Sequence, residues 1–148
     1  MTHFLYRFAG LLAALMLSAA VHAQDIQVEG AWARATAAGR DSASVFMYVT
    51  SKQEATLVGA SSPASRAVEL RTMSHKGSMM KTLVLETIGL PANKRVDMTS
   101  IHGYHLTLTG LNAPLKAGAA LPLTLDIETA DKKNIKIEVR AEIKPPKK

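Results

Sequence analysis

The chain has 148 residues, of which 47% are hydrophobic and only 5% aromatic, and it contains no cysteine. Disulfides and thiolate metal ligands are therefore excluded, and packing alone must stabilise the fold. The formal net charge of +6 raises the question of a nucleic-acid partner. With so few aromatic residues and no recognisable helix-turn-helix, oligonucleotide-binding or RNA-recognition signature, we expect no nucleic-acid binding.

Residues 1–23 are predicted to be a secretory signal peptide. Arg7 precedes an apolar run from Phe8 to Ala20, and a small-x-small sequence ends at Ala23. A membrane anchor is the alternative, but the run is short for a bilayer span and a good cleavage site follows it. We expect the mature chain to work in the periplasm, without stable insertion into a membrane.

Residues 24–143 are predicted to form one all-β domain. Short apolar and β-branched runs alternate with turn signals at about the spacing of a sandwich or barrel. Nine strands are expected, at residues 26–35, 43–50, 56–60, 67–71, 79–86, 95–99, 104–110, 121–128 and 135–143. The last five residues, 144–148, are predicted to be a basic disordered tail, with attraction to an anionic membrane surface as an alternative role.

The strand expected at residues 104–110 has the clearest alternation of polarity. Tyr104, Leu106 and Leu108 fall on one face and His105 on the other, because successive side chains of a strand point to opposite sides. Strands of this kind are half buried in antiparallel sheets. We therefore expect the His105 side chain to point away from the apolar face.

Methionine and histidine are concentrated in one short segment. Beyond residue 23 the chain has five methionines and three histidines, and four of these eight lie within eight residues: Met73, His75, Met79 and Met80. Thioethers and imidazoles suit Cu(I), and a thioether needs no deprotonation before it binds. The combination fits a protein that handles copper outside the cytoplasm.

Some of these side chains have a structural explanation instead. Methionine often fills gaps in a core, and Met47 and Met98 lie in apolar strand contexts that favour this role. Met73 shares strand parity with Arg71, so an outward position is expected if the strand continues that far. His75 falls in a presumed turn, where a histidine is usually only solvated.

Met79 and Met80 are adjacent, so they point to opposite sides of a strand and at most one of them readily reaches a shared site. His102, like His105, can be a surface or hydrogen-bonded histidine rather than a ligand. The sequence has no nucleophile elbow, HExxH motif or phosphate loop. We therefore expect a protein that is not an enzyme.

Several stretches together resemble the periplasmic copper chaperone family written PCu(A)C, and their order and spacing make the resemblance specific. They are AWARAT (31–36), LVGASSP (57–63), VEL (68–70), GSM (77–79), LPA (90–92), GYHLTLTGL (103–111) and PLKAGAALPLTLDIE (114–128). The resemblance implies an antiparallel Greek-key β-sandwich of the cupredoxin type, with an exposed Met/His site for Cu(I).

The ligand positions of that family are altered in this chain. His105 matches the family's His-x-Met motif, but Thr107 replaces its methionine, and Arg71 and Lys81 occupy the places of the other histidine and methionine. Arginine has no lone pair to donate, lysine must first lose a proton, and a hydroxyl is a poor ligand for a soft cation. The inherited site is therefore not expected to bind copper in its usual geometry.

Two hypotheses follow from this departure. In the first, a rearranged site of His105, Met79, Met73 and His75 binds Cu(I), and the protein delivers it to an exported acceptor such as a cytochrome oxidase subunit. In the second, the chain is a metal-free binding or assembly module. Arg71 and Lys81 would then form a basic patch for an acidic partner or an anion.

Overall fold

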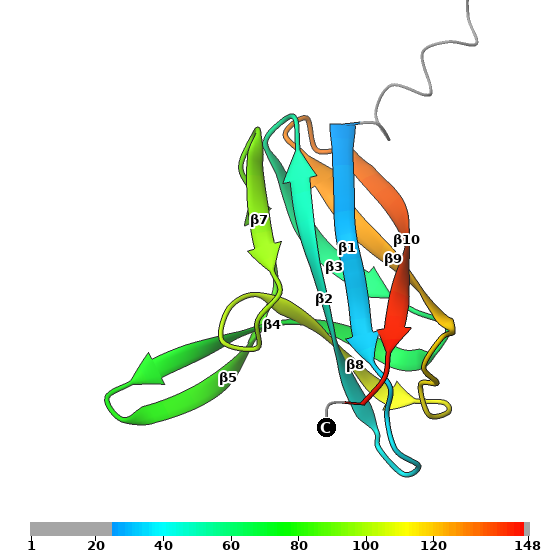
Figure 1. Cartoon of the computed structure of the whole chain (residues 1–148). Coiled ribbons are helices and arrows are strands. Elements are labelled where there is room, and N and C mark those ends of the chain that lie inside the picture. Colours follow the sequence, from blue (N-terminus) through cyan, green and yellow to red (C-terminus); the bar gives the residue numbers. More distant parts are fainter. Residues whose placement is uncertain (1–24, 147–148) are drawn as a thin grey trace, which may run out of the picture.

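The computed structural model describes residues 25–146, which form ten β-strands and no α-helix (Figure 1). The predicted signal peptide and the last two lysines lie outside the described residues. No helix in the described range is long and apolar enough to cross a membrane. The strands are β1 (Ile26–Arg34), β2 (Ser42–Ser51), β3 (Ala55–Ser61), β4 (Ser65–Lys76), β5 (Met79–Leu85), β6 (Ile88–Leu90), β7 (Lys94–Met98), β8 (His105–Leu111), β9 (Ala120–Thr129) and β10 (Asn134–Lys144).

The strands belong to one sheet that folds back on itself. Its order is β5-β4-β8-β2-β1-β10-β9-β3-β6, with β7 beside β2, and a pairing of β3 with β4 closes it into a flattened barrel. The order does not follow the chain, as expected for a Greek-key arrangement. The predicted all-β sandwich is confirmed, although β1 and β10 pair in parallel rather than antiparallel.

The core fills the space between the two sides of the barrel. It is made of alternating aliphatic residues from most strands, among them Leu57, Leu106 and Leu125, each with no exposed surface. Met47 and Met98 are also fully buried and face each other across β2 and β7. The prediction that both methionines fill the core is confirmed, and it matches the adaptable packing of the thioether.

All nine predicted strands are present, with differences at their ends. The three-residue β6 was not predicted, because it is too short to alternate recognisably. Strand β4 continues to Lys76, five residues beyond its predicted end, and β10 includes Lys144. The Lys144 Nζ lies 4.6 Å from the centre of the Trp32 ring, so this lysine packs on the domain instead of starting the tail.

The unpredicted end of β4 pairs with β5 in a hairpin that projects from the barrel (Figure 1, green). We call residues 72–83 the hairpin arm. Its side chains are mostly exposed on both faces, including Met79 at 73% and Met80 at 50%. Because neither face enters the core, the β4 half of the arm, residues 72–76, has no apolar alternation, and the sequence gives no hydrophobic signal for that half.

Candidate functional site

The residues predicted as ligands lie on β8 and on the hairpin arm. Side chains directly opposite each other on neighbouring antiparallel strands share a face. Thr107 on β8 is opposite both Ser44 on β2 and Glu69 on β4, and His105 is opposite Arg71. We call this side of β2, β8, β4 and β5, which faces away from the core, the outer face.

His105 points to the outer face, as predicted, but it is only 4% exposed. Strand β8 is buried on both faces at this end, and on the outer face Phe46 packs with its ring centre 6.4 Å from that of His105. The expectation of a half-buried strand is therefore wrong at this end of β8. The polar residues His105 and Thr107 are both enclosed.

The Nδ1 atom of His105 lies 3.1 Å from the carbonyl oxygen of Gly103. In the neutral ring this contact places the proton on Nδ1, because a carbonyl can only accept a hydrogen bond. The lone pair of Nε2 then remains for a ligand, an arrangement common among metal-binding histidines. In the neutral form, His105 therefore keeps Nε2 as the nitrogen that can donate to a metal.

A pocket of about 250 Å³ opens beside His105 on the outer face. Met73 also lines this pocket and therefore lies beside His105. The expected outward position of Met73 is confirmed. The other residues that line the pocket are polar or small, with one aliphatic side chain: Arg40, Ser42, Ala43, Ser44, Arg71, Thr82, Ile101 and Thr107. This set offers one imidazole and one thioether as soft donors.

His75 and Met80 are directly opposite each other in the hairpin arm. His75 lies within β4 and not in a turn, contrary to expectation, because the turn is confined to Gly77 and Ser78. Met73 shares this face, diagonally across from Met80, since its own partner is Thr82. Diagonal neighbours lie roughly 7–8 Å apart, which long side chains can bridge.

Met79 lies on the opposite face of the arm. It is paired with Lys76, and the pair Ser74 and Lys81 lies two positions along the same side. Alternation along the strand directs its thioether away from the side that holds His75 and Met73. Met79 is therefore not on the face of the arm that holds Met73 and His75, whereas Met80 is.

The remaining predicted ligands do not converge on one point. His105 is paired with Arg71 across β8 and β4. His75 lies four residues beyond Arg71 on β4, which separates Arg71 and His75 by roughly 13 Å along the strand. One ion cannot bind both imidazoles across that distance. The outer face instead has two groups of soft donors, Met73 with His105 at the base and Met73 with His75 and Met80 on the arm.

The basic patch expected from Arg71 and Lys81 is not assembled either. Arg71 makes an ion pair with Glu69, with Nη2 2.6 Å and Nε 2.8 Å from the same carboxylate oxygen. Lys81 is on the other face of the arm, because it pairs with Ser74. The two cations are therefore separated by the hairpin, and one of them is compensated.

Carboxylates and histidines do not cluster elsewhere. Among residues 25–146, no three His, Cys, Asp or Glu side chains lie close enough to hold a metal ion. This part of the chain therefore lacks a cluster of the carboxylate and imidazole ligands that Mg²⁺ and Zn²⁺ prefer.

Comparison with known proteins agrees with this architecture. The model of the family described as "Putative lipoprotein LpqE-like" matches residues 26–139. The chain belongs to the LpqE-like family. A "Putative lipoprotein" from Leifsonia xyli subsp. xyli is 28% identical over 119 residues, which cover 80% of this chain and 71% of that protein.

Solved structures similar to this LpqE-like protein are PCuAC domains. The apo domain of PmoF1 has a TM-score of 0.66 at 20% identity and covers 82% of this chain and 95% of its own. The copper-bound domain of PmoF2 has a TM-score of 0.64 at 25% identity, with coverages of 82% and 94%. CuI-DR1885 from Deinococcus radiodurans has a TM-score of 0.52 at 28% identity, with coverages of 78% and 75%. The resemblance to the PCu(A)C family is confirmed.

Proposed function

We propose that this LpqE-like protein is a Cu(I) carrier of the periplasm, without catalytic activity, and that Met73, His75 and Met80 bind the ion on the hairpin arm. The proposal rests on the strand register that sets His75 opposite Met80, with Met73 diagonal to Met80. Two of the similar structures are named as copper-bound or Cu(I) forms, which supports the choice of metal.

The chemistry of these donors suits transport better than storage. Two thioethers and one imidazole make a soft, neutral set that matches a monovalent copper ion. His75 and Met80 are exposed and Met73 is half buried, so an incoming ligand can approach the ion and displace the donors one at a time. An exported acceptor, such as an oxidase subunit, would receive Cu(I) by this exchange.

His105 supplies a second, more enclosed donor at the base of the arm. It shares the pocket with Met73, whose flexible side chain can turn towards either group. A two-donor position beside His105 would be weaker than the three-donor position on the arm. The periplasmic location is supported by the predicted signal peptide and by the lipoprotein names of the family and of the Leifsonia relative.

The test is an anaerobic titration of the mature chain, residues 24–148, with Cu(I) in competition with a chromophoric chelator. Met80→Leu and His75→Ala should each weaken binding by about tenfold or more, the loss that even residues supporting a metal ligand can cause. Met79→Leu is the matched control, because it removes a neighbouring thioether from the opposite face. It should leave the affinity within about twofold of the wild type.

Three results would count against the arm site. Equal losses in Met79→Leu and Met80→Leu would mean that the face of the arm does not matter. A loss confined to His105→Ala would move the site to the base of the arm. No competition by the wild type for Cu(I) would remove the carrier function altogether.

A further inference from the structure

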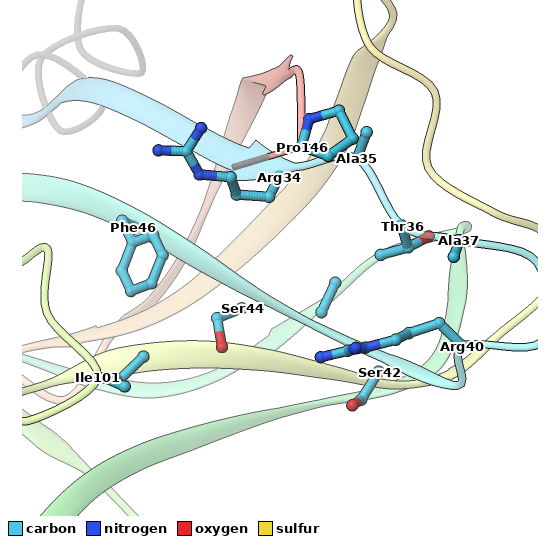
Figure 2. Close-up of a pocket in the computed structure, with 11 residues that line it drawn as sticks. Arg34, Ala35, Thr36, Ala37, Arg40, Ser42, Ser44, Phe46, Ile101 and Pro146 are labelled. Atoms are coloured by element: carbon cyan, nitrogen blue, oxygen red, sulfur yellow. The ribbon is translucent and has the colours of Figure 1, made fainter. Parts of the chain in front are cut away.

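A second, larger depression adjoins the His105 pocket. It has a volume of about 640 Å³ and runs along the start of β2, between the end of β1 and the loop before β2. The two depressions have five lining residues in common: Arg40, Ser42, Ala43, Ser44 and Ile101. We call the continuous depression the β2 groove. Figure 2 shows its wider part, with Arg34 and Arg40 on different sides of Ser44.

Among residues 25–146, every charged residue that lines the β2 groove is an arginine: Arg34, Arg40 and Arg71. Within the described residues, Arg71 is compensated by Glu69, whereas Arg40 makes no ion pair and no side-chain hydrogen bond. Arg34 donates one hydrogen bond to the Pro145 carbonyl oxygen and lies 5.1 Å from the Trp32 ring centre. Neither Arg34 nor Arg40 therefore has a carboxylate partner in this part of the chain.

Hydroxyl groups without partners lie beside these arginines. The Thr107 Oγ1 is buried and has no hydrogen-bond partner in the described structure, although the residue is only 4% exposed. Buried polar groups are nearly always paired, so an orphaned hydroxyl that lines a pocket points to a missing ligand. Ser42 and Ser44 add hydroxyls that also make no hydrogen bond within residues 25–146.

We propose that the β2 groove binds an acidic polypeptide segment of the protein that exchanges Cu(I) with the hairpin arm, an inference that rests on the proposed function. Guanidinium groups bind carboxylates through paired, charge-assisted hydrogen bonds, and hydroxyls donate to the same oxygens. The wider part of the groove alone has a volume of about 640 Å³, which is more than a single small anion fills. It therefore fits a chain with several carboxylates.

The position of the groove gives this segment a role in the transfer. Its narrow end is the pocket that Met73 lines, and Met73 is also one of the proposed Cu(I) ligands. A partner held in the groove would approach the arm from its base, with its own metal site near Met73. Attraction between the arginines and an acidic partner would also raise the rate of encounter, most strongly at low salt.

The test measures the binding of a fluorescein-labelled peptide of about ten alternating glycine and glutamate residues to the copper-free mature protein, by fluorescence anisotropy at low ionic strength. Arg40→Glu should weaken binding at least tenfold. Lys52→Glu is the matched control: it makes the same charge reversal on an exposed residue just beyond the other end of β2, roughly 30 Å away. It should change binding by less than about twofold.

Thr107→Val provides a second variant, which keeps the charge and the shape but removes the buried hydroxyl. It should weaken peptide binding several-fold. Equal losses in Arg40→Glu and Lys52→Glu would reveal only general attraction and would overturn the groove. Displacement of the peptide by inorganic phosphate, but not by chloride of the same ionic strength, would assign the groove to a small anion and overturn the polypeptide.

The same variants separate this proposal from the carrier function. The Arg40→Glu protein should keep the Cu(I) affinity of the wild type, because Arg40 donates no ligand and lies on the loop before β2. If the wild-type protein binds Cu(I) but does not bind the peptide, the groove proposal fails while the carrier function stands. If the peptide binds and Cu(I) does not, the groove is a docking site but its role in copper exchange is wrong.

Discussion

Thr107 stands where the PCu(A)C pattern has a methionine, and its side chain lines the pocket that His105 and Met73 share. We predict that Thr107→Met gives the protein an additional equivalent of bound Cu(I). The new thioether would join the His105 imidazole, so the base of the arm would have two soft donors of its own while Met73 stays with the arm. The pocket of about 250 Å³ has space for the longer side chain.

The control for this substitution is Thr107→Leu, which has a similar size and no sulfur. The measurement is the number of Cu(I) equivalents retained in the presence of a chelator of intermediate affinity. A gain in Thr107→Met alone would establish that the altered position weakened the inherited site. The same stoichiometry in Thr107→Met and the wild type would show that the pocket cannot bring the new thioether and His105 onto one ion.

The hairpin arm is the element that decides the geometry of the proposed site. Gly77 begins its two-residue turn with a φ of 63°, and no atom lies within 4 Å of the position that a Cβ would occupy. Alanine there is disfavoured by the backbone conformation alone, and we expect a local cost of about 1 kcal/mol. Gly77→Ala should therefore increase amide hydrogen exchange in the arm and weaken Cu(I) binding several-fold.

Gly118→Ala is the matched control for the turn. Gly118 also has a positive φ, of 87°, and open space at its Cβ position, but it lies between β8 and β9, outside the arm. It should strain the backbone to a similar degree without changing Cu(I) affinity. Unchanged hydrogen exchange in the Gly77→Ala arm would contradict the assignment of a strained turn.

Different physical signals explain why the strands were predictable and the site was only partly so. Strand β8 alternates because one face enters the core, and Met47 was recognisable as core from its apolar neighbours. The β4 half of the arm, residues 72–76, has no such signal. A two-residue turn at Gly77 and Ser78 would have paired His75 with Met80, so the sequence could have placed Met80, and not Met79, on the face of His75.

The β2 groove could not have been predicted in this way. Arg34 and Arg40 are brought to it from β1 and from the loop before β2, and Ile101 from the loop after β7. No spacing in the sequence relates these segments. Their meeting depends on how the sheet closes and on how the loops fold over it, which are tertiary properties.

In the molecule as a whole, substitutions in the core should lower the free energy of unfolding, whereas substitutions on the exposed arm should leave it almost unchanged. Leu125 on β9 is fully buried and part of the core, whereas Leu83 on the arm is 39% exposed. Leu125→Ala should cost about 2–5 kcal/mol of the free energy of unfolding, a large share of the roughly 5–15 kcal/mol typical of a domain. Leu83→Ala should stay within about 0.5 kcal/mol of the wild type, as is usual for surface positions.

Urea denaturation gives the free energy of unfolding of both leucine variants. A Cu(I) titration of each variant at low urea gives the affinity of the proposed site. The arm lies outside the packed interior, so the folded Leu125→Ala protein should keep the Cu(I) affinity of the wild type while its unfolding midpoint falls. This separation explains how ligand positions such as Arg71 and Lys81 can change without loss of the fold, because neither side chain is buried in the core that holds the barrel together. A fall in Cu(I) affinity that tracks the fall in stability would mean that the arm depends on the core for its conformation.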